Sequence, residues 1–450
     1  MADSEFKKLK IVEQDSWLEP VQDAIYERYQ RFIDKSQAIS KEYGNLKEFA
    51  SAYSYYGIHF NVKENSWIYR EWAPEAKGLF LIGDFNNWEY FTHPLQRLEN
   101  GVWEIKLSFD KYKTTFSHQG KVKVVVQTDE GTMARIPAYI SRVVQNEKTK
   151  DFTGQIWSPE QDYQWKNKSF NFKKEDILIY ECHIGMSQEK EDVGSYQEFT
   201  KDILPKIKEK GYTAIQIMAI AEHPYYGSFG YHVSNFFAPS SRFGTPEELK
   251  ELIDTAHEYG LAVIMDVVHS HTVKNTNEGI NNFDGSGHQY FHSGDRGNHP
   301  AWDSKLFDYG KTEVLQFLLS NLSYWLNEFK IDGFRFDGVT SMMYFHHGIS
   351  FDFGERDNYF TKDVEYDAIT YLQLANHLIK EINPNALSIA EDVSGMPGLC
   401  SPIVEGGLGF DFRLGMGIPD YWIKLLKEIP DPEWNMWQLW DQMTNRNWTI

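Results

Sequence analysis

The chain has 450 residues, enough for two or three domains and a large buried core. Hydrophobic residues make up 41% and charged residues 24%, which is the composition of a soluble globular protein. Lys and Arg total 45 against 65 Asp and Glu, so the net charge of −20 argues against nucleic acid and anionic membranes as partners.

Two further features of the composition bear on ligand and compartment. Aromatic residues reach 16%, with 14 Trp and 26 Tyr, and aromatic rings stack on the apolar faces of sugars, which indicates carbohydrate. The only cysteines, Cys182 and Cys400, lie far apart, which suits a reducing compartment. The N-terminus has no basic-then-apolar signal and no apolar run is long enough to span a membrane, so we expect a cytoplasmic protein.

The first 160 residues predict two parts. Residues 1–50 carry apolar side chains at helical spacing, including Ile25 and Phe32, so we expect an N-terminal helical segment. Across residues 51–160 the pattern changes to short strands separated by Gly, Asn and Pro, with the clearest at 67–72, 79–82, 102–105 and 121–125. Regular short strands of this kind predict a β-sandwich.

Residues 161–450 alternate between strands and helices. The predicted strands are 177–180, 214–218, 261–266, 331–337, 386–391 and 410–414, and the predicted helices are 196–210, 245–260, 313–329 and 366–382. This α/β repeat predicts a parallel sheet, and its length predicts a (β/α)₈ TIM barrel of which about six strands are present. We expect residues 272–310 to form an inserted, solvated loop that rims the cleft.

Acidic residues end three consecutive predicted strands: Asp266, Asp337 and Glu391. In barrels of this kind the chemistry takes place at the C-terminal ends of the strands. Arg335 and Asp337 end a buried strand, where an unpaired charge costs several kcal/mol, so these charges are either paired or functional. A structural pair would explain this strand alone. The three acids together, with His271 just after the first of them, indicate an active site.

These segments resemble a known family. The sequences DVVHSH, GFRFD and IAED are similar to three of the four sequence blocks of the α-amylase superfamily, and stand at residues 266–271, 333–337 and 389–392. GYHV, FGTPEEL and DGVTSM are similar to its glucan-branching members, and stand at 230–233, 243–249 and 337–342. The segments 71–74, 83–88 and 101–103 resemble the carbohydrate-binding module, family 48, that precedes the catalytic domain in glycogen- and starch-acting enzymes.

The resemblance implies a retaining double displacement, which needs two carboxyl groups about 5–5.5 Å apart. Asp337 is then the nucleophile that forms a glycosyl-enzyme. Arg335, two residues earlier on the same strand face, holds Asp337 ionised and oriented. Glu391 is the acid that protonates the departing oxygen and then the base that activates the acceptor.

The resemblance also implies substrate-binding residues. His271 donates to hydroxyls of the reacting sugar, Tyr231 stacks beneath it, and Asp266 orients Arg335 rather than touching substrate. In the carbohydrate-binding module, Trp72 and Trp88 are the candidate sugar contacts. For Trp72 we favour a place in the core, and for Trp88, beside an Asn-rich turn, we leave both interpretations open.

The function implied is glucan branching: cleavage of an α-1,4-glucan and transfer of the released chain to a 6-hydroxyl. The expected partner is glycogen, amylose or starch, acted on by a monomer. One alternative is an α-1,6-debranching or α-amylase-type hydrolase, which uses the same two carboxylates. Another is a non-catalytic glycogen-binding protein, against which the intact Asp337 and Glu391 argue.

We expect no cofactor and no metal. Many amylases bind calcium through an Asn at the position of Ser270, and the hydroxyl here removes a carbonyl ligand of the kind calcium prefers. The superfamily's fourth block, a His-Asp pair after the seventh strand, has no counterpart after Phe410. We therefore expect a C-terminally incomplete barrel that cannot branch glucan by itself.

Overall fold

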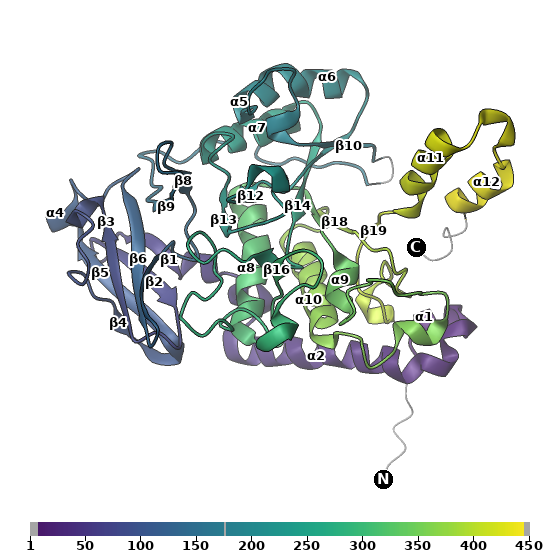
Figure 1. The fold of residues 1–450 in the computed structure, drawn as a ribbon, viewed down its shortest axis with the longest axis horizontal. Helices are drawn as coiled ribbons and strands as arrows, with labels where there is room; N and C mark the ends of the chain where they lie inside the picture. Colours follow the sequence, from purple (N-terminus) through teal and green to yellow (C-terminus); the bar gives the residue numbers. More distant parts are fainter. Residues whose placement is uncertain (1–7, 175–176, 445–450) are drawn as a thin grey trace, which may run out of the picture. The chain divides into compact units, whose positions relative to one another are not determined.

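The computed structural model describes residues 8–174 and 177–444 (Figure 1). The chain divides into two compact units. The continuous unit is Lys47–Asp332, and the split unit combines Met1–Leu46 with Gly333–Ile450. Every helix within the described residues is too short or too polar to cross a membrane. The domain boundaries expected at residues 50 and 160 stay predictions.

The continuous unit begins with a β-sandwich. One sheet has the order β1-β2-β5-β4, and its strands are β1 Gly57–Asn61, β2 Ser66–Trp72, β5 Val102–Ser108 and β4 Gln96–Arg97. The other sheet pairs β3, β6, β9 and β8 in that order, with β7 also on β6: β3 Gly78–Gly83, β6 Lys121–Thr128, β9 Phe152–Gln155, β8 Val143–Gln145 and β7 Gly131–Arg135. The short helix α4 (Phe109–Tyr112) follows β5. All pairs in both sheets are antiparallel, so alternate side chains fill a shared core, as the sequence predicted.

A carboxyl group lies inside this sandwich. Glu71 on β2 is fully buried, and its oxygens accept hydrogen bonds from the Tyr69 hydroxyl, the Ala138 amide and the Trp72 amide. Burial raises the pKa of Glu71 to about 7, against the opposing effect of these three hydrogen bonds. No local pattern of residues predicts that this glutamate is buried.

Glu71 makes the stability of the sandwich depend on pH. The pKa of Glu71 is higher in the folded chain than the ordinary 4.5. Its contribution to the free energy of unfolding is therefore fully present below about pH 4.5 and is lost as pH rises toward 7. Glu71→Gln cannot titrate, so this dependence of the unfolding free energy on pH disappears. The variant also leaves one backbone amide without its acceptor, because the side chain then has a single acceptor oxygen. We therefore expect the variant to be less stable at pH 5 and the gap to close by pH 8, measured by urea unfolding. Parallel stability curves for the two proteins would contradict this assignment.

The continuous unit also holds three parallel strands in the order β10-β11-β14 (Figure 1). Their bounds are β10 Ile179–Cys182, β11 Ala214–Ile217 and β14 Ala262–Val267, and the helices between and after them are α5 Tyr196–Glu198, α6 Leu204–Glu209, α7 Pro246–Glu258 and α8 Thr312–Glu328. Two further pairs are antiparallel: β12 Ala221–Glu222 with β13 Asn235–Pro239, and β15 Thr272–Val273 with β16 Ser304–Lys305. Thr245 and Glu248 form the predicted capping box at the start of α7.

The helix expected over residues 196–210 runs without a break over 196–209, but it is not a regular α-helix throughout. Between α5 and α6 the backbone widens into a π turn over Phe199–Ile203, and Pro205 stands in the first turn of α6. Proline has no N–H and its ring crowds the carbonyl four residues earlier, so a regular α-helical turn cannot run through this point. The predicted helix is therefore confirmed, with a π turn in its middle.

The loop at residues 272–310 was expected to be solvated, and this was wrong. Arg135, on β7 of the sandwich, is buried and donates to the carbonyls of Gly279, Asn281 and Asn282 within the loop. The backbone carbonyl of Trp72 accepts a hydrogen bond from the Gln289 amide group in the same loop. Carbonyl acceptors and apolar side chains together hold the loop against the sandwich, with the buried residues Ile280, Phe283, Tyr290 and Phe291 among them.

The split unit carries three more parallel strands in the order β17-β18-β19, which are β17 Gly333–Phe336, β18 Leu387–Ala390 and β19 Phe412–Arg413. Its later helices are α9 Val339–Met343, α10 Tyr366–Ile382, α11 Gly417–Glu428 and α12 Met436–Thr444. The helices of the N-terminal segment are α1 Lys10–Gln14, α2 Gln22–Tyr43 and α3 Leu46–Phe49. Helix α2 packs against α10, with Phe32 edge-on to His377.

One charged residue of α2 lies in the face predicted to be apolar. Arg28 is buried beside Ile25 and Phe32, and donates to the carbonyls of Pro397 and Gly406 and to the Met396 sulfur. Burial lowers the pKa of Arg28 to about 10. The guanidinium thus ties the N-terminal helix to the segment that follows β18.

Candidate active site

Two carboxylates lie side by side at the ends of β17 and β18. The strands are parallel with Phe336 opposite Ala390, so the next residues of each strand, Asp337 and Glu391, leave the sheet at the same edge. Arg335 joins them: its Nη1 lies 2.9 Å from Asp337 Oδ1 and its Nη2 lies 3.1 Å from Glu391 Oε2. One guanidinium therefore contacts both carboxylates that the sequence singled out.

The backbone after Asp337 completes this cluster. Gly338 has φ +62° in the left-handed region, and its amide donates to Glu391 Oε2 at 2.8 Å. Side chains other than glycine are strained in this conformation. The glycine therefore lets the chain turn sharply after Asp337 while the amide fixes the neighbouring carboxyl.

Glu391 has the electrostatic environment of a general acid. Burial raises the pKa of Glu391, and the nearby charge of Asp337 raises it further, while Arg335 and the Gly338 amide act in the opposite direction. Its side chain is 22% exposed, so a substrate oxygen can reach it. A carboxyl group with a raised pKa next to a second carboxylate is the arrangement that separates acid and nucleophile roles.

The acid next to Glu391 is structural. Asp392 is buried and accepts hydrogen bonds from the Thr340 hydroxyl at 2.6 Å, the Ser394 hydroxyl at 2.6 Å and the Gly395 amide at 2.8 Å. Arg413 lies 3.8 Å away. These contacts anchor the chain directly after Glu391 and leave Asp392 without access to substrate.

The other predicted residues meet in the continuous unit. Asp266 belongs to β14 and is buried, and the Tyr231 hydroxyl donates to its Oδ2 at 2.7 Å. His271 Nε2 lies 3.0 Å from the Tyr231 carbonyl oxygen. The structure thus brings Tyr231, Asp266 and His271 into one hydrogen-bonded group.

The protonation state of His271 follows from its surroundings. Burial, and then the neighbouring His232, lower the pKa of His271 to about 4, so the ring is neutral near pH 7. A carbonyl can only accept, so the single ring proton is on Nε2 and points to Tyr231, while Nδ1 accepts from the Ser270 hydroxyl at 2.9 Å. The Nε2 proton of His271 is therefore already engaged by the Tyr231 carbonyl.

An aromatic residue, Trp302, lies beside His271 and was not among the site residues predicted from the sequence. Trp302 is 37% exposed, and its ring stacks on buried His299 with centroids 4.0 Å apart and lies 5.0 Å from the His271 ring. His299 Nδ1 accepts from the amides of Ala301 and Trp302, which fixes the turn. The only signal in the sequence was the His-rich character of the loop, which carries no regular spacing.

The two tryptophans singled out in the sandwich have different environments. Trp72 is buried, 7% exposed, and meets Tyr290 edge-on at 5.3 Å, which favours a core role. Trp88 is half-buried with φ +61°, and its Nε1 donates to Asp84 at 3.0 Å. Tyr90 and Phe91, close by in the sequence, are exposed. Neither was predicted as a sugar contact.

If the sandwich binds polysaccharide through Trp88, this side chain contributes to affinity and little to chemistry. Trp88→Ala is expected to weaken association with glycogen, because a half-exposed ring contributes by stacking, and to leave turnover of short chains nearly unchanged. A glycogen pull-down measures the first and a short-chain assay the second. Trp88→Phe, which keeps a ring, is the matched control, and unaltered binding by Trp88→Ala would assign this side chain to packing alone.

Within the described residues, no group of three or more His, Cys, Asp or Glu side chains is arranged to hold a metal ion. The Ser270 hydroxyl, at the position that the family's calcium ligand would take, is hydrogen-bonded to His271.

Comparison with known proteins finds a family match for the sandwich region and another for the barrel region. Residues 55–140 match the family of carbohydrate-binding module 48 (isoamylase N-terminal domain), and residues 186–406 match the α-amylase catalytic domain. The catalytic module of the pneumococcal virulence factor SpuA aligns over 78% of this chain and 52% of its own, with TM-score 0.58 and 17% identity. GBS pullulanase SAP aligns over 75% of this chain and 46% of its own, with TM-score 0.56 and 20% identity. Residues 186–406 are thus similar to the α-amylase catalytic domain and residues 55–140 to carbohydrate-binding module 48, and the two solved structures share the fold.

Three similar curated proteins carry the same name. The chain is 49% identical to a 1,4-α-glucan-branching enzyme of Yarrowia lipolytica over 97% of its length, and 48% identical to that of Dictyostelium discoideum over 98%. The enzyme of Felis catus is 47% identical over 98%. The chain spans 65%, 64% and 63% of the length of these three relatives.

Proposed function

We propose that this protein is a 1,4-α-glucan-branching enzyme: it cleaves an α-1,4-glucan and transfers the released chain to a glucan 6-hydroxyl. The observation that carries the proposal is the Arg335 bridge between Asp337 and Glu391, with the pKa of Glu391 raised. The names of the curated relatives support transfer rather than hydrolysis. The proposed substrate is a neutral α-1,4-glucan such as amylose or glycogen.

In the first step Asp337 attacks the anomeric carbon while Glu391 gives its proton to the departing glycosidic oxygen. This breaks the C1–O4 bond and forms a covalent glycosyl-enzyme on Asp337. Arg335 keeps Asp337 ionised before the attack and stays paired to both groups as their charges exchange. The leaving chain departs with the proton, so the balance of charge is kept.

In the second step Glu391, now ionised, removes the proton of an acceptor 6-hydroxyl. The acceptor oxygen attacks the anomeric carbon and releases Asp337, so an α-1,6 bond replaces the α-1,4 bond with the same anomeric configuration. In a hydrolase the same glycosyl-enzyme would meet water instead. Tyr231, Asp266 and His271 are the proposed contacts to the reacting sugar.

Incubation with amylose tests the proposed function and also the expectation from the sequence that the chain cannot branch glucan by itself. New α-1,6 linkages, seen as a loss of iodine colour and as short chains after enzymatic debranching, would support the function and contradict that expectation. An increase in reducing ends without new branches would show a hydrolase. Unchanged amylose that is nevertheless bound would show a glycogen-binding protein.

Trp302 is proposed as a platform for a sugar near His271. Trp302→Ala is expected to raise KM for amylose about tenfold with a smaller change in kcat, because stacking of a pre-positioned ring contributes mainly binding free energy. Trp302→Phe should restore most of the affinity. The exposed Trp437 on α12, changed to Ala, is the control for a general loss of surface tryptophan. An unchanged KM in Trp302→Ala would remove the residue from the substrate site.

A further inference from the structure

The start of α9 contacts the end of β18 through three successive residues of the split unit. The Gly338 amide donates to Glu391 Oε2 at 2.8 Å, and the Val339 amide donates to the backbone carbonyl of Glu391 at 3.0 Å. The next residue, Thr340, donates its hydroxyl proton to Asp392 at 2.6 Å. Consecutive residues of one segment thus contact consecutive residues of the other, which fixes the register between the two strand ends.

The Thr340 hydroxyl uses both of its hydrogen-bonding functions at this place. The residue is 5% exposed, and while its hydroxyl donates to Asp392 it accepts from the Val393 amide at 2.9 Å. The distance to the carboxylate is that of a strong, charge-assisted hydrogen bond. Serine would keep this hydroxyl, whereas valine has nearly the same shape and has neither donor nor acceptor.

Asp392 is also held from its other sides. Besides Thr340, it accepts from the Ser394 hydroxyl and the Gly395 amide. Ser394 is fixed in turn, because its carbonyl accepts from the Tyr359 hydroxyl at 2.9 Å. A buried carboxylate with this many donors is a rigid point in the chain, and it comes directly after Glu391.

The Glu391 carboxyl group depends on such a point because packing alone does not fix it. Its side chain is 22% exposed, and its Oε2 lies 3.1 Å from Arg335 and 2.8 Å from the Gly338 amide. A displacement of about 1 Å between reacting groups can lower a rate by about 10²-fold. The segment next to a reacting side chain therefore has to be rigid for that side chain to be well placed.

We propose that Thr340 is a positioning residue that acts through Asp392 to hold the carboxyl group of Glu391 within reach of the departing glycosidic oxygen. The inference rests on the acid role of Glu391 in the proposed function. Thr340 is buried, so it acts through its neighbour and not on the substrate. A hydroxyl that only stabilised the fold would affect all substrates alike.

Thr340→Val tests this by removing the hydroxyl and keeping the shape. Single-turnover cleavage of amylose should slow by about 10- to 100-fold, whereas formation of the glycosyl-enzyme from α-glucosyl fluoride should change by less than about threefold, because fluoride leaves without a proton. Thr340→Ser should restore most of the rate on amylose. Equal losses on the two substrates would overturn the proposal.

The same substitution is then made in Glu391→Gln. Because the glutamine cannot donate the proton, its exact position no longer limits cleavage, and Thr340→Val should cost nothing further on amylose. The two losses are therefore expected to be non-additive. Additive losses in the double variant would show that Thr340 acts on something other than Glu391.

The pKa of Glu391 provides a measurement that needs no turnover. Thr340→Val loosens the contacts of Glu391 with the Gly338 amide and Arg335, both of which lower its pKa. Burial and the charge of Asp337, which raise it, depend less on a small displacement. The pKa should therefore rise, followed by the carboxyl infrared band that Glu391→Gln removes. An unchanged or lower pKa would contradict the proposal.

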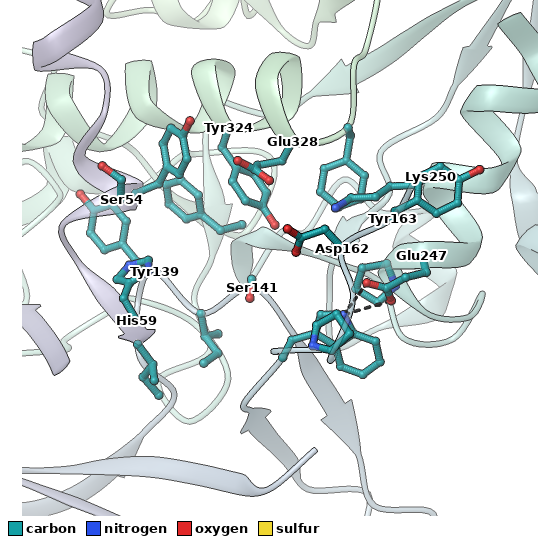
Figure 2. A pocket seen from close by; sticks show the side chains of 18 of the residues that line it. Ser54, His59, Tyr139, Ser141, Asp162, Tyr163, Glu247, Lys250, Tyr324 and Glu328 are labelled. Carbon is teal, nitrogen blue, oxygen red and sulfur yellow. Dashed lines mark hydrogen bonds between the residues drawn. The ribbon is translucent and has the colours of Figure 1, made fainter. Parts of the chain in front are cut away.

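Two control variants remove a hydroxyl elsewhere. Thr370 on α10 is 7% exposed and donates to the Tyr366 carbonyl at 2.9 Å, so Thr370→Val removes an equally buried hydrogen bond from the same unit. Figure 2 shows Ser141 in a cavity of about 340 Å³ in the continuous unit, and Glu391 is not among the residues that line it. Thr370→Val and Ser141→Ala should change neither the ratio of the two substrates nor the pKa of Glu391.

If Thr340→Val does not fold, Ser394→Ala serves instead. It removes a different donor to Asp392, and a smaller change of the same kind is expected in the substrate ratio and in the pKa of Glu391. Folded Ser394→Ala that behaves like Thr370→Val would likewise reject the proposal.

Failure of this inference can be told from failure of the proposed function. The wild-type protein is incubated with amylose in parallel. Branching by a protein in which Thr340→Val behaves like Thr370→Val rejects the positioning role alone. A protein that makes no branches, but in which Thr340→Val raises the pKa of Glu391, rejects the branching function and keeps the positioning role.

Discussion

Asp337→Asn is expected to reduce branching of amylose by about 10⁵-fold or more, since it removes the only group proposed to form the glycosyl-enzyme. The amide is nearly the same size and can still face Arg335, and Arg335 keeps its contact with Glu391. Glucan binding should therefore survive. Initial rates of branch formation and maltoheptaose affinity, measured on the same preparation, test both parts.

The exposed Asp352 provides the matched control for this substitution. Asp352→Asn removes one negative charge from a loop of the same unit and should leave the rate unchanged.

Asp337→Asn should also change the pKa of Glu391. Because the charge of Asp337 raises the pKa of Glu391, Asp337→Asn should lower it, while burial keeps it above the ordinary value. Wild-type-like branching by Asp337→Asn would exclude this residue as the nucleophile.

Glu391→Gln is expected to have an effect that depends on the leaving group. On amylose, where the departing oxygen needs a proton, we expect a loss of about 10²–10⁴-fold, as for other general acids. α-Glucosyl fluoride leaves without protonation, so formation of the glycosyl-enzyme from it should be much less impaired. The comparison is made by single-turnover kinetics with the two substrates.

The pH profile gives a second measure of the same residue. The first step needs protonated Glu391, so the rate on amylose should fall as pH rises through its raised pKa and not at the ordinary pKa of a glutamate. With the fluoride substrate and Glu391→Gln this descending limb should be absent. Glu405→Gln, which removes a partly exposed carboxylate paired with Lys10, is the control. Equal losses on both substrates would reject Glu391 as the acid.

The sequence predicted those features that depend on neighbours along the chain. The helix at residues 366–382 has the predicted bounds, because apolar side chains recur there at helical spacing. The capping box at Thr245 and the six parallel strands of the two units follow from equally local patterns. Asp337 and Glu391 could be chosen for the same reason, since each follows directly after a predicted strand.

The tertiary structure decided which charged groups are buried and what they contact. Arg28 occupies a face predicted to be apolar because its acceptors, Pro397 and Gly406, lie more than 360 residues further along the chain. Glu71 looks like any strand glutamate until both sheets close around it. In each case the burial depends on atoms that no local pattern identifies.

The same division holds for the candidate site. The sequence by itself determined the α/β alternation, the sandwich before it and the acids at the strand ends, since periodicity and motif spacing are properties of short segments. Only the tertiary structure decided that Arg335 contacts both carboxylates, that Trp302 stacks beside His271, and that the loop carrying Trp302 is held against the sandwich. These features arise from contacts between distant segments, whose geometry and desolvation are set by packing and not by the order of residues along the chain.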